Sequence, residues 1–169
     1  MSSAYERELR DIFAGNEETI ERLGKTMSDD AVQKYRKTIE YPFYVLRGAG
    51  SLGVDLMPIR GPIHIPIEVK SSILSTFYFS SSKDDTLQLE SYQRAVKRHQ
   101  MPLLYAYRHK GRRGEKWAVY RLHYVLDPDK LPQTLSFHFV PTIPRTKTGN
   151  RYMPFDDGLP LSEFLDVII

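Results

Sequence analysis

The chain has 169 residues, of which 41% are hydrophobic, and a formal net charge of +3. This length fits one domain with a sizeable apolar core. Cysteine is absent, which excludes disulfides, thiolate metal sites and a cysteine nucleophile, so any metal must bind oxygen or histidine. No apolar run is long enough for a membrane span and the first residues lack a signal peptide's apolar stretch. We therefore expect a cytoplasmic protein that does not contact a membrane.

The first half of the chain is predicted to begin with helices and continue with strands. Residues 3–13 predict a helix with Ser3 as N-cap, and Glu6 stands three residues later at the capping-box position. Residues 16–40 predict two short helices that are interrupted near Gly24, the second capped by Ser28, Asp29 or Asp30. Strands are expected at 43–47, 54–59 and 63–69, and the turn signal Arg60-Gly61-Pro62 joins the last two.

The second half repeats the change from helix to strand. Residues 77–79 predict an edge strand, and residues 87–99 predict an amphipathic helix with Leu89, Tyr92 and Val96 on one face. Strands at 101–107 and 116–122 follow, joined by a basic turn at 109–115. This order of elements predicts a mixed α/β domain with the sheet in its core.

Two acids and a lysine in the central strands form a candidate catalytic group. If Gly61 and Pro62 make a two-residue hairpin loop, Asp55 lies opposite Glu68, and directly opposed residues have Cβ atoms roughly 4.5 to 5.5 Å apart. Glu68 and Lys70 are two residues apart on one strand and therefore share a face. Carboxylates at this separation suit a divalent cation such as Mg²⁺, and a neighbouring ammonium can position water and stabilise charge on phosphorus.

Basic residues are concentrated between Arg94 and Lys116. This segment holds eight lysines and arginines against one acid, Glu115. Such an excess is typical of surfaces that bind a phosphate backbone, although a solvated helix face followed by a charged turn explains it equally well. The residues that we expect to contact DNA are Arg94, Lys97, Arg98, Lys110, Arg112 and Arg113.

Four segments together resemble the archaeal Holliday junction resolvases, a branch of the restriction-endonuclease-like PD-(D/E)xK superfamily. They are the Glu6-Arg7 pair in the first helix, the Arg47-x-x-Gly50-Ser51 loop before Asp55, the Glu68-Val69-Lys70 strand, and the helix 87–99 with the strand 102–107 behind it. The resemblance covers about two thirds of the chain. Val54 stands where the family has a proline before its aspartate.

The resemblance implies a restriction-endonuclease-like sheet flanked by helices, and a role for each matching residue. Asp55 and Glu68 would hold Mg²⁺, with Mn²⁺ as a substitute, and Glu6 would complete the site directly or through water. Lys70 would handle the nucleophile, Ser51 would contact the cleaved strand and Arg47 would contact DNA. The implied function is symmetric nicking of four-way junctions by a homodimer in DNA recombination and repair, without a nucleotide cofactor.

Two segments depart from the resemblance and put the substrate in question. Residues 14–41 form a helical insert within the predicted nuclease domain of residues 1–140. Residues 141–169 form a C-terminal extension that we expect to pack on the domain or on a dimer partner. Two other functions therefore stay open: a repair or restriction-type nuclease for other DNA structures, and a non-catalytic DNA-binding protein of the same fold.

Other polar residues give weaker indications of a role in the site. Glu8 competes with Glu6 as the acid of the first helix, and the apolar spacing does not separate the two. The five histidines show no metal-ligand spacing. Tyr92 is explained by helix packing, and Gln93 beside it could reach the active site or a phosphate.

Overall fold

The computed structural model describes residues 3–48, 53–122 and 137–169. The helices are α1 (Ala4–Phe13), α2 (Glu17–Gly24), α3 (Asp29–Glu40), α4 (Lys83–His99) and α5 (Leu161–Ile168). The strands are β1 (Tyr44–Arg47), β2 (Leu56–Arg60), β3 (Ile63–His64), β4 (Ile67–Ser72), β5 (Thr76–Tyr78), β6 (Leu104–His109), β7 (Trp117–Arg121), β8 (Tyr152–Pro154) and β9 (Leu159–Pro160), and a 3-10 helix η2 spans Phe155–Asp157. No helix in these ranges is both long and apolar enough to cross a membrane.

Local capping explains where the helices begin. Ser3 accepts a hydrogen bond from the Glu6 backbone N–H at 3.0 Å, as predicted for the N-cap of α1. Ser28 is the residue that caps α3. Helix α4 begins at Lys83, four residues earlier than predicted, because Ser82 accepts from the Asp85 backbone N–H and starts the helix there.

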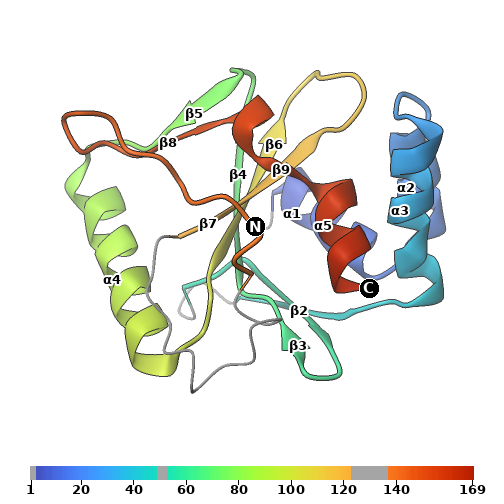
Figure 1. The fold of residues 1–169 in the computed structure, drawn as a ribbon, viewed down its shortest axis with the longest axis horizontal. Coiled ribbons are helices and arrows are strands. Elements are labelled where there is room, and N and C mark those ends of the chain that lie inside the picture. Colours follow the sequence, from blue (N-terminus) through green and yellow to red (C-terminus); the bar gives the residue numbers. More distant parts are fainter. Residues whose placement is uncertain (1–2, 49–52, 123–136) are drawn as a thin grey trace.

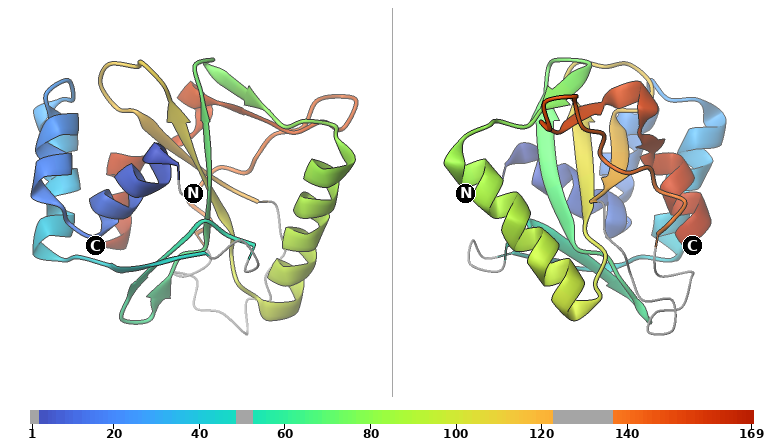
Figure 2. Two further views of the ribbon diagram at one scale, coloured as in Figure 1. Left: turned by 180° about the vertical axis from the view of Figure 1, so that it is seen from behind. Right: turned by 60° about the vertical axis from the view of Figure 1, so that its left-hand side comes forward.

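A mixed sheet divides the molecule into layers. Its strands are ordered β1-β2-β4-β6-β7-β9, with β3 paired to β2. The β4–β6 pair is parallel and the others are antiparallel. Helix α4 covers one face, while α1 and α5 cover the other and α2 and α3 lie outside them (Figures 1 and 2). The predicted mixed α/β architecture, with the sheet in the core and helices on both faces, is confirmed.

Strands β6 and β7 are buried on both faces, so their side chains alternate between two apolar clusters. Leu104 and Ala106 join the cluster that includes α1 and α5, whereas Tyr105 and Tyr107 join the cluster under α4. Glu68 is aligned with Tyr105, and Lys70 with Tyr107. Because aligned residues of neighbouring strands share a face, Glu68 and Lys70 are directed to the α4 side.

The insert and the extension contact each other. Helix α3 of the insert packs on α5 of the extension, with ion pairs at 2.7 Å from Lys34 to Glu163 and from Lys37 to Asp166. Strand β9 extends the central sheet beside β7, and β8 forms a two-stranded ribbon with β5. Residues 141–169 are thus integrated into the same body as the sheet.

Candidate functional site

The β2–β4 hairpin brings Asp55 and Glu68 together. Ile59 is paired with His64 and Leu56 with Ile67, which is the register expected from a Gly61-Pro62 loop. One residue further along, the Asp55 backbone N–H donates to the Ile67 carbonyl at 3.1 Å. The Asp55 Oδ2 atom accepts a hydrogen bond from the Val69 N–H at 2.7 Å, so the aspartate is oriented against the strand that carries Glu68.

Glu68 is a buried carboxylate with two hydrogen-bond donors. Only 5% of the residue is exposed. Lys70 Nζ lies 2.9 Å from Oε1, and the Tyr92 hydroxyl donates to Oε2 at 2.9 Å. Gln88 in turn donates to the Tyr92 hydroxyl oxygen at 3.2 Å. Each oxygen of Glu68 therefore has its own donor, which fixes the orientation of the carboxylate.

Asp55 lies in an electronegative environment. The pKa of Asp55 is raised from 3.8 to about 6, mainly by burial and in addition by the charges of Glu68 and Glu6. The Val69 N–H and the Lys70 ammonium act in the opposite direction without cancelling the effect. Burial and the neighbouring negative charges both disfavour the ionised form of Asp55, and a bound cation would favour that form.

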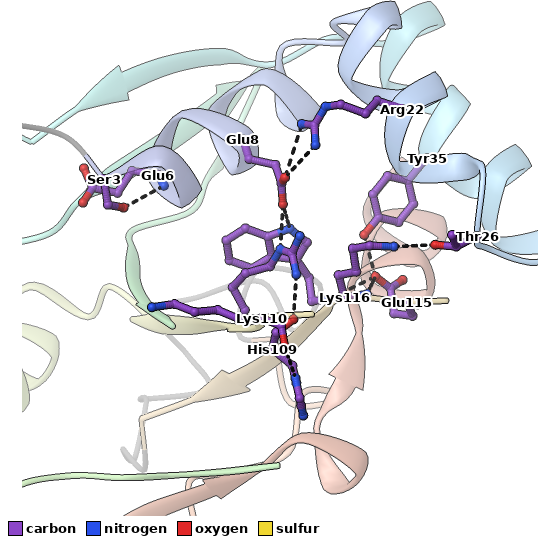
Figure 3. Close-up of polar contacts among 12 residues, drawn as sticks. Ser3, Glu6, Glu8, Arg22, Thr26, Tyr35, His109, Lys110, Glu115 and Lys116 are labelled. Carbon is purple, nitrogen blue, oxygen red and sulfur yellow. Dashed lines mark hydrogen bonds and ion pairs between the residues drawn. The ribbon is translucent and has the colours of Figure 1, made fainter. Parts of the chain in front are cut away.

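Glu6 and Glu8, the two candidate acids of α1, have different surroundings. The charge of Glu6 raises the pKa of Asp55. Glu8 instead accepts from Arg108 Nε at 2.7 Å and Trp117 Nε1 at 3.0 Å, and pairs with Arg22 at 3.2 Å. Figure 3 shows Ser3 and Glu6 together at the start of α1, apart from the contacts around Glu8. Of the two acids, Glu6 is the one placed to influence Asp55.

The basic segment of residues 94–116 does not form one surface. Arg94, Lys97 and Arg98 are exposed near the C-terminal end of α4, whereas the turn of residues 109–115 follows β6 at the other end of the sheet (Figure 1). Arg108, one of the eight basic residues, is 7% exposed and paired with Glu8. It is therefore part of the core, and its charge is not available to a phosphate.

The three residues of the turn that we expected to contact DNA are not equally free. Arg112 pairs with Asp156 at 2.6 Å and stands 4.3 Å from the centre of the Phe155 ring. Lys110 lies 5.6 Å from the Tyr5 ring centre. Arg113 is exposed, as is Arg47 at the end of β1. Arg47 and Tyr92 both line a cavity of about 420 Å³. Tyr92 belongs to α4, the helix that also carries Arg94 and Lys97.

The remaining candidate residues are either outside the described ranges or lie on α4 beside Glu68. Gly50, Ser51 and His123 lie outside the described residues. Tyr92, which sequence reasoning assigned to packing, contacts Glu68, and Gln88 was missed. The available signal was that a buried tyrosine usually finds a partner for its hydroxyl. Within the described ranges, no three histidine or acidic side chains are grouped closely enough to hold a metal ion by themselves.

Comparison with known proteins adds a likeness of fold. No protein-family model and no curated protein matches the chain. Among solved structures, the chain is similar to Hjc, a Holliday junction resolvase from the archaeal hyperthermophile Archaeoglobus fulgidus, with a TM-score of 0.48 and 18% identity over 77% of this chain and 87% of that chain. At this identity residue roles do not transfer, so the site is interpreted from its own geometry.

Asp55→Asn is expected to stabilise the protein at pH 7.5 and to change its stability little at pH 4. Since the folded-state pKa is about 6 against a usual 3.8, the unfolded chain ionises first, and stability falls as pH rises from about 4 to 6. Asparagine removes the charge and keeps an oxygen for the Val69 N–H. After allowance for solvent screening of this partly exposed group we expect about 1 kcal/mol, or roughly 2 to 4 °C in Tm.

Thermal denaturation in EDTA at both pH values measures this effect, with Glu8→Gln as the matched comparison. Glu8 has its cations in place, so removing its charge leaves Arg108 buried without an anion and should cost about 3 to 5 kcal/mol at pH 7.5. A lower Tm for Asp55→Asn at pH 7.5 would show that Asp55, like Glu8, is a structural acid.

Proposed function

We propose that this chain is a metal-dependent endonuclease that hydrolyses phosphodiester bonds in DNA, with its active site at Asp55, Glu68, Lys70 and Glu6. The observation that carries the proposal is the Asp55 carboxylate, just before β2, held against the strand β4 that carries Glu68, with the Lys70 ammonium 2.9 Å from Glu68. A structural ion pair would need one acid and one base. Here the charges of Glu68 and Glu6 both add to burial in raising the pKa of Asp55, whereas Lys70 lowers it.

The donor set fits Mg²⁺ or Mn²⁺. Mg²⁺ commonly uses one or two protein carboxylates and keeps several waters, so it needs no cluster of three side chains. In our proposal Asp55 and Glu68 hold the ion, and Glu6 completes the site directly or through water. Such an ion, when bound, polarises the scissile phosphate and lowers the pKa of its water.

The residues around the carboxylates have separate roles in this proposal. The Val69 N–H orients Asp55, and Tyr92 orients Glu68. Lys70, on the same face as Glu68, positions the attacking water through its ammonium and stabilises the negative charge that develops on the phosphate oxygens. Because these groups are held on two strands and a helix, little reorganisation is required during reaction.

DNA would cross the face that carries α4 and the β1 end of the sheet. Arg47, Arg94, Lys97 and Arg98 are exposed there, and we propose that Ser51 contacts the cleaved strand. Lys110, Arg112 and Arg113 would contact more distant phosphates. Contacts of this kind position the backbone without reading bases, so binding should depend strongly on salt and little on sequence.

The proposed substrate is branched DNA, and in particular a four-way junction. Such a junction has two-fold symmetry, so two symmetric nicks require two sites related by a two-fold axis, which a homodimer provides. The reaction would serve DNA recombination and repair in the cytoplasm. Cleavage of other DNA structures, or binding without cleavage, are the outcomes that the following experiment separates.

Glu68→Gln is expected to reduce the rate of Mg²⁺-dependent cleavage at least about a hundredfold, because a lost ion ligand removes several kcal/mol of transition-state stabilisation. The measurement is a gel assay on a fixed four-way junction and a linear duplex of the same sequence, each with Mg²⁺ and with EDTA. Glu21→Gln, which removes an exposed acid from α2, is the matched control and should cleave like the wild type.

The three outcomes of this assay are distinct. Paired nicks in the junction alone, lost with EDTA and in Glu68→Gln, support the proposal in full. Equal cleavage of both substrates keeps the nuclease and rejects junction selectivity. Tight binding of the junction with no cleavage by wild type rejects the enzyme and leaves a DNA-binding protein.

Tyr92→Phe is expected to raise the Mg²⁺ concentration required for half-maximal cleavage about tenfold or more, since Glu68 loses the hydrogen bond that orients one of its oxygens. The maximal rate at saturating Mg²⁺ should change less. Titration of the cleavage rate with Mg²⁺ measures both quantities. An unchanged half-saturation value would mean that Tyr92 serves only to pack α4 on the sheet.

A further inference from the structure

A second polar pocket lies away from the carboxylates, between the N-terminal half of α4 and a hairpin of the C-terminal extension. Its volume is about 280 Å³. The hairpin pairs Arg145 with Arg151 and is closed by a hydrogen bond of 2.8 Å from the Thr146 N–H to the Asn150 carbonyl. In Figure 1 this segment, drawn in orange before β8, reaches the start of α4.

Arg151 is a buried cation that has no ion pair with any residue of the described ranges. Only 7% of the residue is exposed, and its Nη1 atom is buried with no hydrogen-bond partner. Its backbone is fixed, because its carbonyl accepts from the Phe79 N–H at 3.0 Å. Among the described residues no carboxylate forms an ion pair with Arg151 or Arg145. An unpaired buried charge is costly, and buried charges in proteins are ordinarily paired.

The pocket concentrates positive charge. Burial lowers the pKa of Arg151, and the neighbouring charge of Arg145 lowers it further, so two guanidinium groups act on each other here. Ser80 and Ser81 line the pocket just before α4, and Thr86 lines it from the N-terminal end of the helix, where the helix dipole adds partial positive charge.

The acids nearby do not neutralise this charge. Glu90 is the one acidic residue that lines the pocket. Its carboxylate is paired with Arg94 at 3.9 Å and not with Arg145 or Arg151. Asp84 and Asp85 belong to the first turn of α4 but are not among the lining residues. Neutral donors, by contrast, are present in Ser80, Ser81, Gln93 and Asn150.

We propose that this pocket binds a phosphate group, held by Arg145 and Arg151 and by the surrounding hydroxyl and amide donors. Arginine forks match phosphate oxygens, and a dianion would relieve the repulsion between the two guanidinium groups. The phosphate belongs either to a nucleic-acid backbone or to a small phosphate compound. Phosphate binding itself does not depend on the proposed nuclease activity, whereas the backbone source rests on it.

The first test is binding of inorganic phosphate to the full chain, measured by calorimetry and by the shift in Tm, with chloride at equal ionic strength as reference. Phosphate should bind the wild type, and Arg145→Gln and Arg151→Gln should weaken that binding at least tenfold. Lys147→Gln is the matched control, because Lys147 is an exposed cation of the same hairpin that does not line the pocket. It should bind phosphate like the wild type.

Two results would overturn the proposal. One is a wild type that responds to phosphate no more than to chloride, and the other is an equal loss in Arg145→Gln and Lys147→Gln, which indicates general charge screening. Since Arg145 is exposed, its variant remains informative if Arg151→Gln does not fold. Glu90→Gln should bind phosphate at least as tightly as the wild type, and weaker binding would contradict the assignment.

A second arm identifies the source of the phosphate. Junction DNA binding is measured in EDTA, where cleavage does not occur, for the wild type, Arg145→Gln and Lys147→Gln. A loss of about tenfold in Arg145→Gln alone assigns the pocket to the DNA backbone. Unchanged DNA affinity with lost phosphate binding assigns it to a small phosphate compound. If the wild type binds phosphate but does not cleave DNA, the proposed nuclease function is rejected and the phosphate pocket is not.

Discussion

The burial of Glu68 is the constraint on which the candidate site depends. A carboxylate that is 5% exposed between apolar layers must have donors on its oxygens, and these come from Lys70 on its own strand and Tyr92 on α4. The crossover through α4 returns the chain to β6, parallel to β4, so that Tyr92 is held over the sheet. The central sheet, the helix above it and the acidic site thus form one arrangement.

The two glutamates of α1 show how position on a helix gives two acids different surroundings. Glu8 has three partners from three other elements and joins α1 to β6, β7 and α2. Glu6, two residues earlier and therefore on a different face of the helix, adds its charge to Asp55. The first arrangement neutralises its acid and stabilises the fold. The second arrangement raises the pKa of Asp55.

Local signals were the part of the structure that sequence could predict. The N-cap Ser3 and the hairpin register around Gly61 follow from contacts between residues close in the chain, and both predictions were confirmed. For α3 the sequence left Ser28, Asp29 and Asp30 open, and the structure has Ser28 as the cap. The start of α4 was placed too late because Ser82 lies in a serine-rich stretch in which several residues could serve as the cap.

Contacts between residues far apart in the chain could not be predicted from such local sequence signals. Arg108 belongs to a basic segment by composition, yet it is buried against Glu8, one hundred residues earlier. Tyr92 has the spacing of a packing residue and also binds Glu68. The two halves of the basic segment are separated because β6 carries the chain from one end of the sheet to the other. In each case the tertiary arrangement, not local sequence, decides the role.

The measurement that tests the central claim most directly is a crystal of the protein soaked in Mn²⁺, with anomalous scattering recorded above the manganese edge. We expect an anomalous peak beside the carboxylates of Asp55 and Glu68, and no such peak in Asp55→Asn. A wild-type crystal with no peak at these carboxylates, or with Lys70 still paired to Glu68 and manganese bound elsewhere, would contradict the assignment of this site to metal-dependent catalysis.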